Sequence, residues 1–254
     1  MIEISDLSKN YGTKQALQHL TLQIKPGEIF GFLGHNGAGK STTIKNLVSI
    51  IEPTSGSITV DGLDLAEHRQ EIKQKIAYVP DTPDIFLQLT AMEYWNLLAS
   101  AYELAEQDIQ ARRNKLVALF NMEEHVDETM ASFSHGMRQK AVLIGALLSD
   151  PDIWILDEPM QGLDPQAAYD LKQLMKAHAQ KGKTVIFSTH NLDTAQQLCD
   201  ELAILKTGKL IYNGSVQDLL AQHAGKSLEE IYLEMAGRQG DNHLVDDIEG
   251  DTHE

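Results

Sequence analysis

A glycine-rich segment at residues 34–41 constrains the fold of this chain more than any other feature. Its sequence fits the pattern Gly-x-x-x-x-Gly-Lys-Ser/Thr. The apolar run at residues 28–33 precedes it and predicts a buried strand, and residues 40–49 follow without a helix breaker and predict a helix. The pattern therefore predicts a strand, a glycine-rich loop and a helix in series, which is typical of an α/β fold.

The predicted loop has the chemistry of a phosphate site. Its glycines let successive backbone N–H groups turn toward one anion, and the helix that follows adds the positive end of its dipole. Lys40 supplies a charge for the outer phosphates of a nucleotide, and the Ser41 hydroxyl is suited to ligate Mg²⁺. A glycine-rich turn with a solvated lysine is the alternative. The predicted nucleotide-binding residues of this segment are Gly34, Asn36, Gly37, Ala38, Gly39, Lys40, Ser41 and Thr42.

A second apolar run, residues 153–156, ends in two adjacent carboxylates, Asp157 and Glu158. Carboxylates at the end of a buried strand are costly unless a cation or a reaction uses them. In ATPases with such a phosphate loop the acidic residue of this strand holds Mg²⁺, so we assign Asp157 to the metal. We assign Glu158 to the base that accepts a proton from the attacking water. An aspartate that caps a loop beside a solvated glutamate is the alternative.

The segment between these two sites has a different pattern. Residues 81–149 contain amphipathic helices, at 91–101 and 107–120, and few strand signals, which predicts an inserted helical subdomain. Short β-rich runs open the chain, and strands and helices alternate again after residue 153. We expect an α/β fold with a P-loop NTPase (RecA-like) core, an N-terminal antiparallel β subdomain and the helical insertion.

The acidic composition and the two ends of the chain limit its location and partners. The sequence has 37 acidic against 21 basic residues and a net charge of -16, which disfavours a nucleic-acid partner. Its apolar runs are shorter than the ~20 residues that cross a bilayer. Residues 1–5 lack a leader pattern, and Cys199 is the one cysteine, so we expect a cytoplasmic protein. Residues 222–254 predict a short helix and a disordered acidic tail.

Residues 133–140 resemble the signature motif of ABC ATPases, with Ser134 and Gly136 in matching positions. Asp164 lies in a segment similar to the D-loop of that family, and His190 follows a predicted strand as its switch histidine does. Tyr11 is similar to the aromatic residue that stacks on adenine. The resemblance covers residues 1–221, which we take as one ABC ATPase domain.

This resemblance implies an ATP-binding and ATP-hydrolysing transporter subunit that uses Mg²⁺. Ser134 at the start of a predicted helix would form a second anion site. The family solution is a head-to-tail dimer with ATP between Lys40 of one subunit and Ser134 of a second ABC ATPase subunit. A polytopic membrane permease is the implied partner, which places the chain on the inner face of the cell membrane. The motif sequences are similar to those of bacterial exporter ATPases of the Ecs kind.

The sequence departs from the family pattern at three positions. Asp81 stands where the family usually has a glutamine that senses Mg²⁺, so Asp81 is a candidate metal ligand and a candidate contact of the permease. His135 and Met137 replace a glycine and a glutamine of the signature. ABC-type ATPases that act on nucleic acid or on the ribosome remain the alternative. This sequence lacks the coiled coils, zinc-binding cysteines or second fused domain that such proteins usually carry. A regulatory ATP-binding module without turnover is a further alternative, which Glu158 disfavours.

Overall fold

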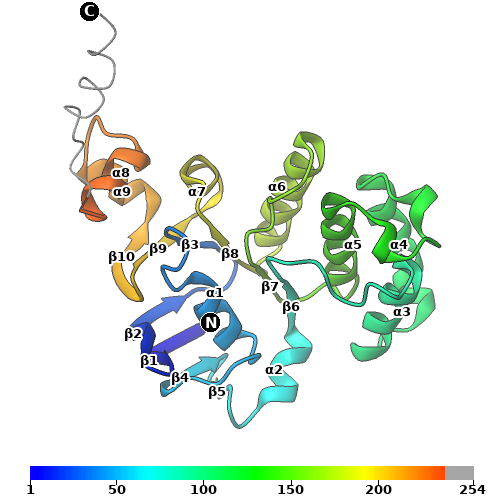
Figure 1. The fold of residues 1–254 in the computed structure, drawn as a ribbon, viewed down its shortest axis with the longest axis horizontal. Helices are drawn as coiled ribbons and strands as arrows, with labels where there is room; N and C mark the ends of the chain where they lie inside the picture. The colour runs from blue at the N-terminus through cyan, green and yellow to red at the C-terminus, as the bar shows by residue number, and fades with distance from the viewer. Residues whose placement is uncertain (238–254) are drawn as a thin grey trace, which may run out of the picture.

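The computed structural model describes residues 1–237, and within them the strands form two sheets (Figure 1). The smaller sheet is antiparallel and has the order β2-β1-β4-β5. Its strands are β1 (Ile2–Tyr11), β2 (Lys14–Ile24), β4 (Ser55–Val60) and β5 (Leu63–Asp64). This sheet is the N-terminal antiparallel β subdomain that the sequence predicts.

The larger sheet has the order β10-β9-β3-β8-β7-β6. Its strands are β3 (Ile29–Leu33), β6 (Ile76–Val79), β7 (Ile153–Leu156), β8 (Thr184–Thr189), β9 (Glu201–Lys206) and β10 (Lys209–Ser215). The five strands β9, β3, β8, β7 and β6 pair in parallel, and β10 pairs antiparallel with β9. Every residue of β3, β7 and β8 is buried, as expected for parallel strands that are covered on both faces.

The parallel order brings four loops to one edge of the larger sheet. Leu33 at the end of β3 pairs with Thr189 at the end of β8, and Leu156 at the end of β7 lies beside Phe187 of β8 and Val79 of β6. The residues that follow these strands therefore meet at the carboxyl edge, where ligands bind in sheets of this type.

The helices surround the larger sheet and extend to one side as a separate lobe (Figure 1). The lobe contains α3 (Ala91–Ala101), α4 (Glu106–Leu119) and α5 (His135–Leu148), and the buried Trp95 indole of α3 donates a 2.9 Å hydrogen bond to Ala141 O of α5. The remaining helices are α1 (Lys40–Leu47), α2 (Arg69–Lys75), α6 (Pro165–Gln180), α7 (Leu192–Leu198), α8 (Val216–Gln222) and α9 (Leu228–Met235), and two short 3₁₀ turns lie at Glu123–His125 and Met130–Ser132.

The predicted fold class is confirmed, and two helices of the lobe lie close to their predicted bounds. The helix predicted at residues 91–101 is α3, and the one predicted at 107–120 begins one residue earlier, as α4. The patterns did not predict α2, whose seven residues contain one buried apolar side chain, Ile72. The expected acidic tail lies outside the described residues. Between residues 1 and 237, none of the helices is both long and apolar enough to span a bilayer.

Candidate functional site

The glycine-rich loop connects β3 to α1 at the carboxyl edge of the larger sheet. Gly39 is the N-cap of α1 with φ 116, and a Cβ atom there would come within 2.8 Å of Leu17 Cδ2. A left-handed backbone against a packed side chain admits only glycine. Thr43 N–H donates to Gly39 O at 2.9 Å, so the N–H groups of Lys40, Ser41 and Thr42 stand at the open end of the helix without an intrahelical acceptor. The loop therefore has the geometry of an anion site.

Lys40 lies folded over this loop with only 5% of its side chain exposed. Its Nζ donates to Gly34 O at 2.6 Å and lies 3.3 Å from Glu158 Oε1. A buried ammonium group must be paired, and here the loop carbonyl and one carboxylate share that role. The pairing brings the end of β7 to the phosphate loop, a contact that residue spacing alone does not show.

Asp157 follows β7 and is fully buried. Its Oδ1 accepts a 2.5 Å hydrogen bond from Ser188 Oγ, while its Oδ2 has no protein partner. Burial raises the pKa of the Asp157 carboxyl, and the negative charge of Asp81 raises it further. Hydrogen bonding by the Ser188 and Ser41 hydroxyls lowers this pKa but does not cancel the rise. A buried carboxylate oxygen without a partner, close to a hydroxyl and a second carboxylate, fits a hard cation that binds oxygen.

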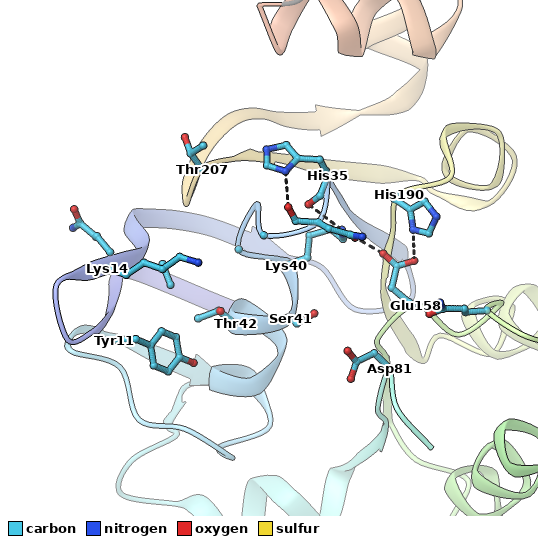
Figure 2. Close-up of a pocket in the computed structure, with 16 residues that line it drawn as sticks. Tyr11, Lys14, His35, Lys40, Ser41, Thr42, Asp81, Glu158, His190 and Thr207 are labelled. Carbon is cyan, nitrogen blue, oxygen red and sulfur yellow. Dashed lines mark hydrogen bonds and ion pairs between the residues drawn. The ribbon is translucent and has the colours of Figure 1, made fainter. Parts of the chain in front are cut away.

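Glu158 adopts a strained backbone with φ 47, which a glutamate rarely does. Its N–H donates to Ser188 Oγ at 2.9 Å, and its Oε2 lies 3.0 Å from His190 Nδ1 in the loop after β8 (Figure 2). Its side chain is 14% exposed. The turn therefore aims the carboxylate away from the sheet and between Lys40 and His190, where it can act on a bound molecule.

Lys40, Glu158 and His190 line a cavity of about 540 Å³ (Figure 2). Most of the predicted site residues line it: Tyr11, Asn36, Gly37, Gly39, Lys40, Ser41, Thr42, Asp81, Glu158 and His190. Gly34, Ala38 and Asp157 are buried and do not line the cavity. Tyr11 stands at its rim and is 48% exposed. The size suits a nucleotide rather than a single phosphate ion.

The structure adds residues that the sequence did not single out. Lys14, His35, Gln161 and Thr207 also line the cavity, together with Gln15 and Ala16. Ser188 links Asp157 to Glu158 from beneath. The one available signal for Ser188 was its place at the end of a strand next to the acidic strand, because parallel neighbours end side by side.

Ser134, Gly136 and Asp164 do not line this cavity. Ser134 is the N-cap of α5 and accepts a 3.3 Å hydrogen bond from Met137 N–H. Asp164 caps α6 by accepting from Ala167 N–H at 2.9 Å and pairs with Lys140 Nζ at 2.7 Å, and Lys140 lowers the pKa of the Asp164 carboxyl. A Cβ atom at Gly136 would come within 2.5 Å of Gly162 O, so glycine here lets the two helix starts approach closely. These residues form a separate surface.

Comparison with known proteins decides the family. A family model described as "ABC transporter" matches residues 17–161. The ABC-type transporter ATP-binding protein EcsA of Bacillus subtilis is 35% identical over 237 residues, which cover 92% of this chain and 96% of the relative. The chain belongs to the ABC transporter family. It is therefore an ATPase of the ABC type, and the sequence-based resemblance is confirmed at this level.

Other members of the family match along most of the chain. Nod factor export ATP-binding protein I of Rhizobium etli is 32% identical over 98% of this chain and 77% of its own length. A solved ATP-binding subunit of an ABC transporter is 37% identical with a TM-score of 0.87, over 92% of this chain and 99% of that one. A dimeric ATP-binding cassette in a post-hydrolysis state, bound to ADP and Pi, is 25% identical with a TM-score of 0.77. The match covers 85% of this chain and 99% of that one. These structures share the α/β fold described above.

Proposed function

We propose that this ABC ATPase binds ATP with Mg²⁺ in the cavity of about 540 Å³, hydrolyses it there, and dimerises head to tail on ATP to drive a separate membrane permease. The observation that carries the proposal is the convergence of Lys40, Asp157, Glu158 and His190 at the carboxyl edge of the larger sheet. Hydrolysis of a nucleotide requires a cation that binds phosphate, a carboxylate that can hold a metal and a carboxylate that can act as a base. Lys40, Asp157 and Glu158 are suited to these three tasks.

Each residue receives a separate role in this proposal. The open N–H groups at the start of α1 and the Lys40 ammonium bind the phosphates, and Tyr11 at the rim stacks on the adenine. Glu158 accepts a proton from the attacking water. His190, 3.0 Å from Glu158 Oε2, orients that carboxylate. Gly34, Asn36, Gly37 and Ala38 shape the loop.

Ser41, Asp157 and Asp81 would hold Mg²⁺. The unpartnered Oδ2 of Asp157 and the effect of Ser41 and Asp81 on its pKa support this set. One hydroxyl and two carboxylates are fewer ligands than an all-protein site needs, but Mg²⁺ commonly completes its shell with water and with the phosphates of a nucleotide. The cation would neutralise the phosphate charge that develops during hydrolysis.

The head-to-tail dimer follows from the separation of the two anion sites. Ser134 and Gly136 lie at the open start of the fourteen-residue helix α5, outside the cavity that contains Lys40. We therefore expect a nucleotide held by Lys40 of one subunit to meet Ser134 of a second subunit. The similarity to a dimeric cassette with ADP and Pi supports a dimer, and Asp164 would help to position the second subunit's contribution.

The permease and the direction of transport rest on the relatives. EcsA is named as a transporter ATP-binding protein, and Nod factor protein I is named for export. We therefore propose an exporter, with the chain in the cytoplasm and attached to the inner face of the membrane through the permease. Asp81, at the junction between β6 and the helical lobe, is the proposed contact through which the permease senses the nucleotide.

The test is ATP binding and phosphate release by the purified chain and by its Lys40→Ala variant, with and without Mg²⁺. The wild-type protein should release phosphate only with Mg²⁺. Loss of charge-assisted hydrogen bonds should weaken ATP binding by about tenfold to a hundredfold in the variant. An equal affinity in the variant would contradict the phosphate site. The permease is tested separately: the rate of phosphate release should change when the chain is reconstituted with the membrane protein that co-purifies with it.

A further inference from the structure

The C-terminal helix α9 reaches the phosphate loop through one side chain. The hydroxyl of Tyr232, on α9, accepts a 3.0 Å hydrogen bond from the backbone N–H of His35. The two residues are 197 positions apart in the chain. His35 is the first residue after Gly34, at the start of the loop. A distant element therefore holds a backbone group of the loop that would bind the nucleotide.

The peptide groups at this end of the loop are held at several points. While Tyr232 takes the N–H of His35, the carbonyl of His35 accepts from Ala38 N–H at 3.1 Å and lies 3.4 Å from Lys40 Nζ. The His35 N–H shares its peptide group with the Gly34 carbonyl, which accepts from Lys40 Nζ at 2.6 Å, so the orientation of that peptide influences the position of the Lys40 ammonium. A change at Tyr232 can reach the phosphate-binding groups through one residue.

Helix α9 is itself firmly fixed. Its Leu228 and Ile231 are 1% and 0% exposed and belong to the main hydrophobic cluster, as do Ala195 and Leu198 of α7. Lys206 Nζ donates to Ala236 O at 2.5 Å, and Lys206 is the last residue of β9, directly before Thr207 of the cavity. Ser227 and Glu230 form a capping box at the start of the helix. A rigid support can hold the loop in one conformation.

The tyrosine also faces the other side of the site. A smaller cavity of about 280 Å³ is lined by Tyr232, His190, Leu192 and the loop residues from Gly34 to Asn36. Helix α7, which packs on α9, begins two residues after His190. Tyr232 therefore stands between the phosphate loop and the loop of His190, the two segments that meet at Glu158.

We propose that Tyr232 is a positioning residue for nucleotide binding. Its hydroxyl fixes the His35 peptide, so the phosphate loop is preformed when the nucleotide arrives and less ordering is needed on binding. The proposal deepens the function proposed above and rests on it for the identity of the nucleotide. It predicts that affinity for ATP depends on α9, while the rate of the chemical step at saturating ATP does not.

The variant Tyr232→Phe tests this, because it removes the hydroxyl and keeps the ring. Loss of one neutral hydrogen bond should raise the Kd for Mg²⁺ and ATP by about twofold to tenfold. The rate of phosphate release at saturating ATP should stay within about twofold. Amide hydrogen exchange at His35, measured without nucleotide, should become faster by a similar factor. Titration calorimetry and exchange measured by NMR provide these readouts.

Tyr212→Phe is the matched control, since the Tyr212 hydroxyl donates to Ser215 O at 2.8 Å in the same part of the chain but does not touch the loop. It should leave the Kd for ATP and the His35 exchange unchanged. The proposal is overturned if Tyr232→Phe binds ATP as tightly as the wild type does, or if His35 exchange is the same in both. Failure of the wild type itself to bind ATP would instead refute the proposed function, and the exchange experiment would then decide only whether Tyr232 holds the His35 N–H.

Discussion

Two regions of this ABC ATPase carry family motifs but differ in how their polar groups are satisfied. In the phosphate side, which we define as Lys40, Ser41, Asp157, Glu158 and His190, a buried carboxylate oxygen has no partner and one backbone is strained. In the α5–α6 end, which comprises Ser134, Gly136 and Asp164, both capping side chains are bonded within the chain. The polar groups of the phosphate side leave room for a ligand, as the proposed function requires. The capping groups of the α5–α6 end are satisfied within the chain, and we propose that this end meets a second subunit.

The charges of the two regions differ in the same way. Burial raises the pKa of the Asp157 carboxyl, whereas Lys140 and the Ala167 N–H lower the pKa of the Asp164 carboxyl. The ionised form of Asp157 therefore opposes folding at neutral pH, and the ionised form of Asp164 favours it. The comparison teaches that the polar groups of the phosphate side stabilise the fold less than those of the α5–α6 end do, a pattern common at active sites.

The largest expected effect is that of Glu158→Gln on the phosphate side. Removing the base should lower phosphate release by about 10²- to 10⁴-fold, because general base catalysis contributes that much. ATP binding should stay within a fewfold of the wild-type value, since Lys40 and the loop amides remain. Stopped-flow phosphate release and calorimetry measure the two quantities. A parallel loss of binding and turnover would show that Glu158 supports the ground state instead.

A smaller effect is expected at the α5–α6 end, from Ser134→Asp. Aspartate is as good an N-cap as serine, so α5 should remain stable, but its carboxylate would face the phosphate of a nucleotide bound by the partner. We expect at least a tenfold loss of phosphate release and loss of the ATP-dependent dimer in sedimentation, with unchanged ATP binding by the single subunit. Ser134→Asn is the uncharged control and should lose less. If Ser134→Asp hydrolyses ATP normally, Ser134 is only a helix cap.

The smallest effects concern stability and have opposite signs in the two regions. Asp157→Asn should raise the free energy of unfolding at pH 7 by about 1–2 kcal/mol, because it removes a buried charge whose Oδ2 has no partner. Asp164→Ala should lower it by about 0.5–2 kcal/mol through loss of the N-cap. As the pH falls through the lowered pKa of Asp164, its ion pair with Lys140 is lost and the wild type should lose part of this advantage. Urea unfolding without nucleotide measures the change in unfolding free energy for both variants. A change of the same sign in both would contradict the comparison.

Much of the fold and of the phosphate side could be predicted from the sequence because the signals there are local. The loop pattern, the apolar strands and the carboxylates after residue 156 each occupy a short segment, and parallel strands bring their ends together. The helices α3 and α4 of the lobe were predicted from local composition, in segments with few strand signals. Short elements such as α2 and α7 were not predicted, because they have too few apolar residues to show a period.

The contacts between distant segments could not be predicted. Tyr232 reaches His35 from the far end of the chain, and Ser188 joins Asp157 and Glu158 through a hydroxyl that no pattern marks. The left-handed backbone of Glu158 is not the preference of a glutamate, and the hydrogen bond from its N–H to Ser188 Oγ accompanies it. Likewise, sequence motifs alone do not tell which of two anion sites belongs to the cavity of the same subunit.

The head-to-tail arrangement is tested most directly by cross-linking between two variants. Asn36→Cys places a thiol on the phosphate loop, and His135→Cys places one beside Ser134; both positions are exposed. Cys199 can remain, because it is buried and burial raises the pKa of its thiol. Both variants carry Glu158→Gln so that ATP persists, and each must first be shown to bind ATP.

A short bifunctional thiol reagent is then added to the two variants mixed or alone. The account predicts a cross-linked dimer in the mixture that requires Mg²⁺ and ATP, and little product from either variant alone. It is contradicted if the mixture cross-links no better than the single variants, or equally well without nucleotide. In that case the α5–α6 end would be a capped helix start and not half of a nucleotide site.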